Sequence, residues 1–191
     1  MTATITTRHL AGTEVPQAGT FSIDASHSEV GFAVRHLMVS KTRGRFIEFE
    51  GTITIADEPS ESSVEVSIAT ASVHTGDEQR DGHLRSGDFF DVEQHPAMIF
   101  RSTAVRLSDP SRFEVDGDLT ISGVTNPVTL LASYEGVAAD PWGGERIAFS
   151  ARTELDREAW GLAWNQALET GGFLVGKKVT IELEIEAVRA S

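Results

Sequence analysis

The stretch Ser28-Glu29-Val30-Gly31-Phe32-Ala33-Val34-Arg35-His36 decides the fold of this chain. Large apolar side chains alternate in it with small or polar ones, and this period of two predicts a β-strand with one face toward a core and one toward solvent. His36 shares the parity of Val30, Phe32 and Val34, so the apolar face ends in an imidazole. Such a surface suits an amphiphilic ligand. A half-buried strand of a β-sandwich would show the same pattern, so this stretch alone leaves both interpretations open.

The composition narrows the class of protein. A chain of 191 residues is long enough for one all-β domain with a real core. The formal net charge of −13 argues against DNA, RNA or an anionic membrane as the natural partner. The chain has no cysteine, which excludes disulfides, thiolate nucleophiles and cysteine-ligated metal sites and fits a reducing compartment.

The first residues carry no targeting signal that we can identify. Residues 1–10 lack the apolar core of a signal peptide, and no apolar run in the chain approaches the roughly 20 residues of a membrane-spanning helix. We therefore expect a cytoplasmic protein with no stable membrane insertion. Residues 1–18 are polar and rich in threonine, so we expect a flexible lead-in before a barrel domain over residues 19–191.

The rest of the chain shows the period of a β protein. Turn sequences at 109–111 and 123–127 separate apolar-polar alternations at hairpin spacing, which implies antiparallel neighbours. Closure into a barrel would remove the unpaired edges of such long strands, and tilted strands of about ten residues would enclose a tube for an extended lipid tail. Two interruptions look helical, one over 75–85 with Thr75 and Glu78 at capping-box spacing, the other starting near Asp156 and including residues 159–162. The predicted strands span 21–24, 28–36, 45–56, 64–68, 98–107, 113–121, 128–134, 147–155 and 179–187.

The residues that carry catalysis in other proteins lack a working arrangement here. No two histidines have the spacing of a helical zinc motif or of a His-x-His strand pair, so we expect no metal and no cofactor. Ser28 follows His27, but neighbouring residues of a strand point to opposite faces, and no Gly-x-Ser-x-Gly turn occurs. An enzyme, a hydrolase or isomerase with His27, His36 or Asp24 as acid–base groups, stays as the alternative.

Aromatic and basic residues mark possible ends of the barrel. Phe89 and Phe90 lie in a connection before a strand, where they would plug the end of a core or line the mouth of a pocket. Trp160 and Trp164 are four residues apart and would cover the same opening from one helical face. Positive charge at a rim would come from the lysine pair 177–178 or from Arg43 and Arg45.

Five motifs in order give the chain a resemblance to a known family. It resembles the YceI-like family of lipocalin-like, polyisoprenoid-binding proteins from about residue 20 to the C-terminus. The motifs are Asp24-x-x-His27-Ser28-x-Val30-x-Phe32-x-x-x-His36, Gly44-x-Phe46-x-x-Phe49-x-Gly51, His83-Leu84-x-Ser86-x-Asp88-Phe89-Phe90-Asp91-Val92 with Pro96 and Phe100, Gly117-x-Leu119-Thr120-Ile121-x-Gly123-Val124-Thr125-x-Pro127-Val128, and Leu155-Asp156-Arg157-x-x-Trp160-Gly161-Leu162.

The resemblance implies an all-β fold, an eight-stranded antiparallel lipocalin-like barrel with one or two short helices. It also implies an interior that holds a long isoprenoid chain, a polyprenyl lipid or an isoprenoid quinone, without catalysis. Members of the family are commonly homodimers, many are exported to the periplasm, and the family is loosely linked to stress responses. This chain departs from the pattern at Trp160, where a phenylalanine would be more usual, and at the lysines 177–178, where we would expect an acidic residue.

The predicted binding residues form two groups, one that contacts the apolar tail of the lipid and one that contacts its polar end. We expect His27, His36 and Arg43 to meet the polar end of the lipid. A filled core with no ligand is a third interpretation. The side chains expected to hold the tail or close the barrel are Val30, Phe32, Val34, Phe46, Phe49, Ile53, Ile55, Phe89, Phe90, Trp160 and Trp164.

Overall fold

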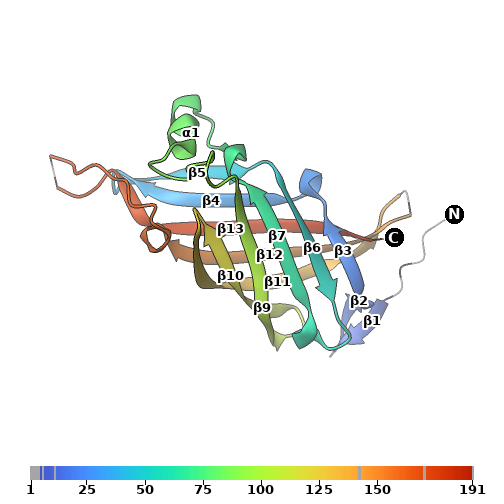
Figure 1. Ribbon diagram of the computed structural model, residues 1–191. Coiled ribbons are helices and arrows are strands. Elements are labelled where there is room, and N and C mark those ends of the chain that lie inside the picture. Colours follow the sequence, from blue (N-terminus) through green and yellow to red (C-terminus); the bar gives the residue numbers. More distant parts are fainter. Residues whose placement is uncertain (1–4, 6, 11, 142, 170, 191) are drawn as a thin grey trace.

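The computed structural model describes residues 5, 7–10, 12–141, 143–169 and 171–190. Eight strands close into an antiparallel barrel in the order β3, β6, β7, β9, β10, β11, β12, β13 (Figure 1). The ring closes because β13 pairs with β12 along one edge and with β3 along the other. The predicted eight-stranded barrel is confirmed. Its strands are β3 (Gly19–Ile23), β6 (Phe49–Ile55), β7 (Ser63–Ala69), β9 (Ala97–Asp109), β10 (Arg112–Ile121), β11 (Val124–Ala139), β12 (Glu145–Asp156) and β13 (Val175–Arg189).

Two strands, separated by the short 3-10 turn η1 (Ala25–His27), share the edge of β13 that lies opposite β12. Asp24 caps this turn by accepting a hydrogen bond from the Ser26 backbone N–H. Before the turn β3 pairs with the C-terminal end of β13, and after it β4 (Glu29–His36) pairs with the rest of β13. The stretch that decided the fold is thus β4, which carries β5 (Ser40–Phe46) and β8 (Val73–His74) as an extension of the sheet.

The sequence prediction missed β5 and β8 as separate strands. The single strand predicted over 45–56 is wrong, because β5 ends at Phe46 and β6 begins at Phe49. The alternation of apolar residues continues through the turn and hides it, although Ile47 lies in the turn with 54% of its surface exposed. The missed part of β5 has polar side chains on its solvent face, so it gives no apolar run for periodicity to find.

The helix boundaries also differ from the prediction. α1 (Glu78–Arg85) begins after Asp77, whose side chain accepts a 2.9 Å hydrogen bond from the Arg80 backbone N–H. Thr75, the predicted cap, instead donates to the buried carboxylate of Asp81 at 2.5 Å. The second predicted helix is only the 3-10 turn η4 (Arg157–Trp160). Trp160 and Trp164 therefore do not share a helical face as predicted.

The N-terminal segment contains a hairpin where a flexible lead-in was expected. β1 (Thr7–Leu10) pairs with β2 (Thr13–Pro16), and β2 packs against β11. The Arg8 guanidinium donates to the carbonyls of Ala56 and Asp57 at 2.6 and 2.7 Å, and Val15 is buried. These tertiary contacts order a polar sequence that has little tendency to fold by itself. Residues 1–4, 6 and 11 of the expected lead-in lie outside the described residues.

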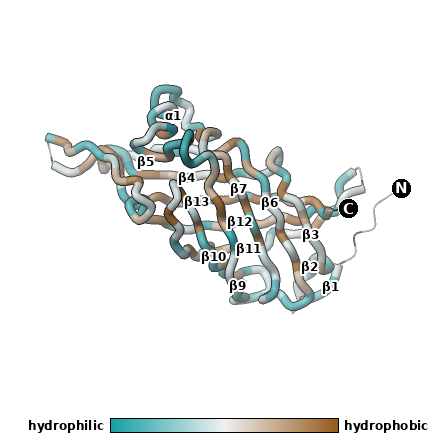
Figure 2. Tube along the Cα trace, in the orientation of Figure 1, coloured by the Kyte–Doolittle hydropathy of each residue, from teal (hydrophilic) through white to brown (hydrophobic). Residues whose placement is uncertain are grey.

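Side chains point alternately into the barrel and toward solvent. Figure 2 shows hydrophobic and hydrophilic residues alternating along the strands. In β9 the pairing skips Thr103, because Asp116 faces Ala104 while Gly117 faces Ser102. This bulge changes the parity, so both Phe100 and Val105 face inward. Two further 3-10 turns, η2 (Pro59–Glu61) and η3 (Thr70–Ser72), connect strands. Within the described residues, no helix is long and apolar enough to span a bilayer.

Candidate functional site: a cavity through the barrel

A cavity of about 940 Å³ runs through the interior of the barrel. All eight strands of the ring contribute side chains to its wall, and so do α1 and the N-terminal hairpin. Most of these side chains are aliphatic or aromatic, since they occupy the inward positions of the strands. The space has the size and apolar character of a site for a long lipid.

Most of the predicted binding residues lie in the wall of this cavity. Four alternate side chains of β4 point into the cavity, as the sequence predicted, and they are Val30, Phe32, Val34 and His36. His36 is therefore the last residue of an otherwise apolar row. The predicted residues that line the cavity are Val30, Phe32, Val34, His36, Phe46, Ile53, Ile55, Phe89, Phe90, Trp160 and Trp164.

Three predicted residues do not line the cavity. His27 belongs to η1 on the outside of the barrel, and its side chain is 58% exposed. Arg43 points outward from β5, where its guanidinium lies 3.3 Å from the Glu182 carboxylate. Phe49 packs against the core but is not part of the cavity wall. The placement of His27 and Arg43 at the polar end of a ligand in this cavity is therefore wrong. The error for His27 arises from a kink in the chain before β4. The error for Arg43 arises because its side chain lies on the outward face of β5.

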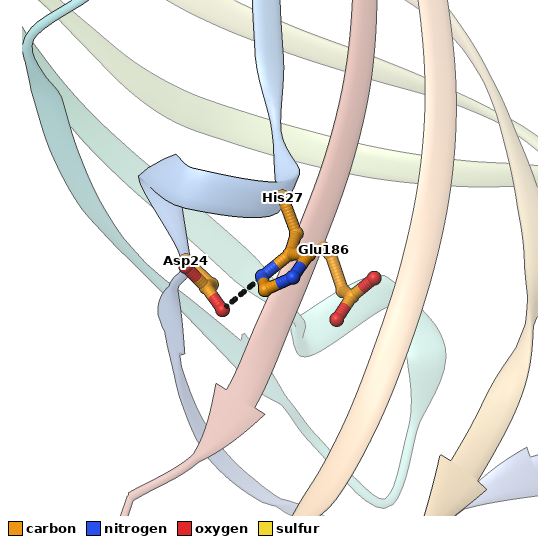
Figure 3. A group of neighbouring side chains, drawn as sticks. All are labelled: Asp24, His27 and Glu186. Carbon is orange, nitrogen blue, oxygen red and sulfur yellow. Dashed lines mark hydrogen bonds and ion pairs between the residues drawn. The ribbon is translucent and has the colours of Figure 1, made fainter. Parts of the chain in front are cut away.

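His27 instead belongs to a cluster of polar residues outside the barrel. One ligand atom from each of Asp24, His27 and Glu186 lies within 4.8 Å of the others, a spacing that could hold a metal ion (Figure 3). The Arg146 guanidinium, however, lies 2.7 Å from the Asp24 carboxylate and 2.6 Å from that of Glu186. Hydrogen bonds from Arg146, Ser26 and His27 hold the pKa of Asp24 well below its usual range. The Arg146 guanidinium thus already neutralises the carboxylates of Asp24 and Glu186. The cluster is an ion-pair network.

The same cluster resembles a catalytic triad only in its composition. The Ser26 hydroxyl and the Asp24 carboxylate lie 3.0 and 2.8 Å from the same ring nitrogen of His27, Nδ1. A working triad needs the acid and the nucleophile on different nitrogens of the ring, so that a proton can pass through the imidazole. This geometry, together with its place outside the cavity, removes support from the hydrolase alternative.

Aromatic rings close the end of the cavity beneath α1. The Phe46 ring lies 5.7 Å from that of Phe32 and 5.6 Å from that of Phe90. Trp164 contacts the rings of both His83 and Phe89, at 4.5 and 5.6 Å between centroids. Phe89 and Phe90 are therefore half-buried rings that both pack on the core and line the cavity, which joins the two alternatives that the sequence left open.

Buried polar groups hold the loops around this end. The Trp160 indole N–H donates to the Leu119 carbonyl at 2.9 Å, so this side chain is a core residue with a satisfied donor. The buried guanidinium of Arg157 donates to the carbonyls of Leu162, Trp164 and Gly176. Burial lowers the pKa of Arg157. These bonds fix the segment between β12 and β13 against the barrel.

The sequence prediction missed the opposite end of the cavity. There the wall includes Phe113, Tyr134 and Phe149, one from each of the neighbouring strands β10, β11 and β12. Arg8 and Val15 of the N-terminal hairpin also contribute. The inward parity of β10–β12 was visible as alternation in the sequence, but nothing in it showed that the hairpin folds over this end.

Comparisons with known proteins agree with this fold. The YceI-like domain matches residues 21–187. A UPF0312 protein of Staphylococcus aureus (strain USA300) is 37% identical over 170 residues, which cover 87% of this chain and 95% of the relative. The structure of Burkholderia cenocepacia BcnA is similar with a TM-score of 0.76 at 22% identity, over 86% of this chain and 98% of that one.

Two further solved structures have the same fold. A YCEI protein of Campylobacter jejuni matches with a TM-score of 0.70 at 30% identity, over 82% of this chain and 90% of that one. A polyisoprenoid binding domain from Saccharophagus degradans, described as implicated in plant cell wall breakdown, matches with a TM-score of 0.69 at 15% identity, over 89% and 98%. The family match and the close relatives together show that this chain belongs to the YceI-like family.

Proposed function

We propose that this protein binds a long-chain isoprenoid lipid, a polyprenyl lipid or an isoprenoid quinone, inside its barrel and stores or carries it without chemical change. The observation that carries the proposal is the apolar cavity of about 940 Å³ that runs through the barrel. Burial of roughly 400 Å² of lipid tail at about 25 cal/mol per Å² would contribute about 10 kcal/mol before the costs of ordering the tail. No catalytic group is needed for such binding.

Membership of the YceI-like family supports the proposal, as does the similarity to a domain described as polyisoprenoid binding. The enzyme alternative has less support, because Asp24 and His27 lie outside the cavity. The two histidines in the cavity wall are His36 and His83, and His83 is engaged by the Asp88 carboxylate at 2.8 Å. A cytoplasmic location, a homodimer and a link to stress stay predictions from the sequence, and the proposed binding requires none of them.

Native mass spectrometry of the freshly purified protein, without added ligand, tests the proposal. We expect a co-purifying mass that extraction identifies as an isoprenoid lipid. Delipidated protein should then gain the mass of an isoprenoid quinone when it is mixed with that quinone. Phe32→Trp, which places a larger ring in the cavity wall, should reduce lipid retention while changing the melting temperature little. A bare mass together with no uptake of isoprenoid lipid would overturn the proposal, and turnover of an ester would favour the enzyme.

A further inference from the structure

Two turns at one end of the molecule expose a group of apolar side chains. The first turn joins β4 to β5 and exposes Leu37, Met38 and Val39, at 40, 63 and 78% of their surface. The second lies in the segment before β13 and exposes Phe173 at 49%. The Leu37 backbone N–H donates to the Leu174 carbonyl at 2.9 Å, so the two turns lie side by side (Figure 1). We propose that the four exposed side chains, the apolar tip, dock this end of the protein on the surface of an anionic lipid bilayer.

The backbone of the first turn is unfavourable for the apolar residues that it carries. Leu37 and Met38 have φ values of 52° and 64°, and the Val39 N–H donates to the His36 carbonyl at 3.1 Å, as in a two-residue hairpin turn. Such turns favour asparagine and glycine, because other residues are strained at positive φ. Packing does not require Leu37 and Met38 either, since both side chains are exposed. A binding role explains why a strained turn carries exposed apolar side chains.

The strands next to the apolar tip carry positive charge. Residues 35–45 contain no acidic residue, and their four lysine and arginine residues are all exposed, Arg35, Lys41, Arg43 and Arg45. Arg35 and Lys41 face each other across β4 and β5, and neither forms an ion pair or a side-chain hydrogen bond with a described residue. Like charges opposite each other in a sheet are destabilising. Anionic head groups would compensate this charge while the apolar tip entered the head-group layer.

This local charge is opposite in sign to that of the whole chain. The formal net charge of −13 argues against an anionic membrane as a partner for the chain as a whole. At physiological ionic strength, however, exposed charges more than about 8 Å apart are largely screened from each other. A docked protein therefore responds mainly to the charges nearest the bilayer, and the negative charge of the rest keeps the binding weak. We expect reversible docking by one end of the molecule.

The shape of the apolar tip favours a bilayer over a protein partner. A stable protein interface buries about 800 Å² on each partner, whereas the apolar tip consists of two narrow turns. His36 and Leu174, at the bases of these turns, line the cavity. Docking would thus bring one end of the cavity close to the lipid phase. The docking does not require that the cavity hold an isoprenoid lipid, so it can be tested apart from the proposed function.

The test measures binding of the full-length protein to vesicles by co-sedimentation. One set of vesicles contains equal amounts of phosphatidylglycerol and phosphatidylcholine, and the other contains phosphatidylcholine alone. We expect the wild type to bind the anionic vesicles, and to bind them less as the salt concentration rises. Leu37→Asn/Met38→Gly should bind at least about tenfold more weakly, because two apolar side chains no longer enter the head-group layer. Its melting temperature should equal or exceed that of the wild type, since asparagine and glycine suit the turn.

A second double variant tests the positive charge. In Arg35→Gln/Lys41→Gln, each removed cation should weaken binding to the anionic vesicles about fivefold. Arg101→Gln/Arg112→Gln is the control with the same net charge, since both arginines are exposed on other strands. Leu131→Asn is the control for the apolar tip, because Leu131 is 60% exposed on β11. Both controls should bind as the wild type does.

A label on the apolar tip reports its contact with lipid. The chain has no cysteine, so a polarity-sensitive dye can be attached to Val39→Cys alone. We expect its emission to shift to the blue on anionic vesicles, with no shift for a label on Asp57→Cys, whose native side chain is 89% exposed after β6.

Three outcomes would overturn docking by the apolar tip. They are no binding of the wild type to anionic vesicles, equal binding by Leu37→Asn/Met38→Gly, and a dimer in ultracentrifugation that this variant dissociates while the Val39→Cys label shows no blue shift on vesicles. The last outcome would identify a second copy of the chain as the occupant. Vesicle binding by a protein whose cavity takes up no isoprenoid lipid would overturn the proposed function alone.

Discussion

Phe90 links the end of the barrel to its core. Its ring packs edge-on against Phe46, and its backbone N–H donates to the Leu84 carbonyl at the end of α1. Because the ring is half-buried, we expect Phe90→Ala to reduce the free energy of unfolding by about 3 kcal/mol, near the lower end for loss of a phenylalanine from a core. Urea denaturation measures this change. Phe173→Ala is a matched control, since that ring is 49% exposed, and a loss below about 1 kcal/mol for Phe90→Ala would place its ring outside the core.

The carboxylate of Asp24 makes the stability of the folded protein depend on pH in the acidic range. Its pKa is held below that of an aspartate in the unfolded chain, chiefly by the hydrogen bond from Arg146. A carboxylate with a lowered pKa stabilises the folded state above the unfolded pKa of 3.8, and this stability is lost as the pH falls through the folded value. We expect the melting temperature of the wild type to fall steeply below about pH 4.

Asp24→Asn should remove part of this acid dependence. The variant should be less stable than the wild type at pH 7, and its melting temperature should change less between pH 4 and pH 2, because it has no carboxylate to protonate. Asp57→Asn is the control, since that carboxylate is 89% exposed. Parallel curves for Asp24→Asn and the wild type would show that the ion pair with Arg146 does not govern acid stability.

At the scale of the strands, two glycines leave room for aromatic rings on neighbouring strands. The ring of Phe32 lies over Gly44 on β5, and the ring of Phe100 lies over Gly117 on β10. A Cβ atom added at Gly117 would lie 2.5 Å from the Phe100 ring and 2.6 Å from the Arg101 carbonyl. Each aromatic ring can occupy this position only because the neighbouring glycine has no side chain.

Gly117→Ala should therefore destabilise the barrel. We expect a loss of about 1–3 kcal/mol in the free energy of unfolding, since either the ring or the β9 backbone must move. Gly87→Ala is the control, because nothing lies within 4 Å of a Cβ atom added there. Equal stability of the two variants in urea denaturation would mean that the Phe100 ring can adopt another conformation without loss of packing.

The elements differ in how far the sequence could predict them. Long strands with an apolar inward face, such as β4 and β13, are visible as alternation and were found with the correct parity. β5 was missed because its outward residues are charged, and the β1–β2 hairpin because its order depends on carbonyls far away in the sequence. The capping error at Thr75 has a similar cause, since the choice between Thr75 and Asp77 depends on how Asp81 is buried.

The same distinction applies to the binding site of the whole molecule. Residues whose inward position follows from parity, such as Val34 and His36, do lie in the cavity wall, and their contact with a ligand stays a prediction. The roles of His27 and Arg43 depended on where a kink turns the chain and which face a short strand presents, and both were misplaced.

The cavity has a consequence for the volume of the molecule. Unfolding eliminates the poorly packed space inside a ligand-free barrel, and the volume change on unfolding scales with the void that is lost. A lipid bound as proposed would fill this space of about 940 Å³ with close-packed atoms. Hydrostatic pressure should therefore unfold the delipidated protein at a lower midpoint than the loaded one, a difference that fluorescence in a pressure cell would measure. Equal volume changes on unfolding of the two forms would mean that the walls of the delipidated barrel move inward and close the cavity. The barrel would then be deformable and would not keep a preformed cavity.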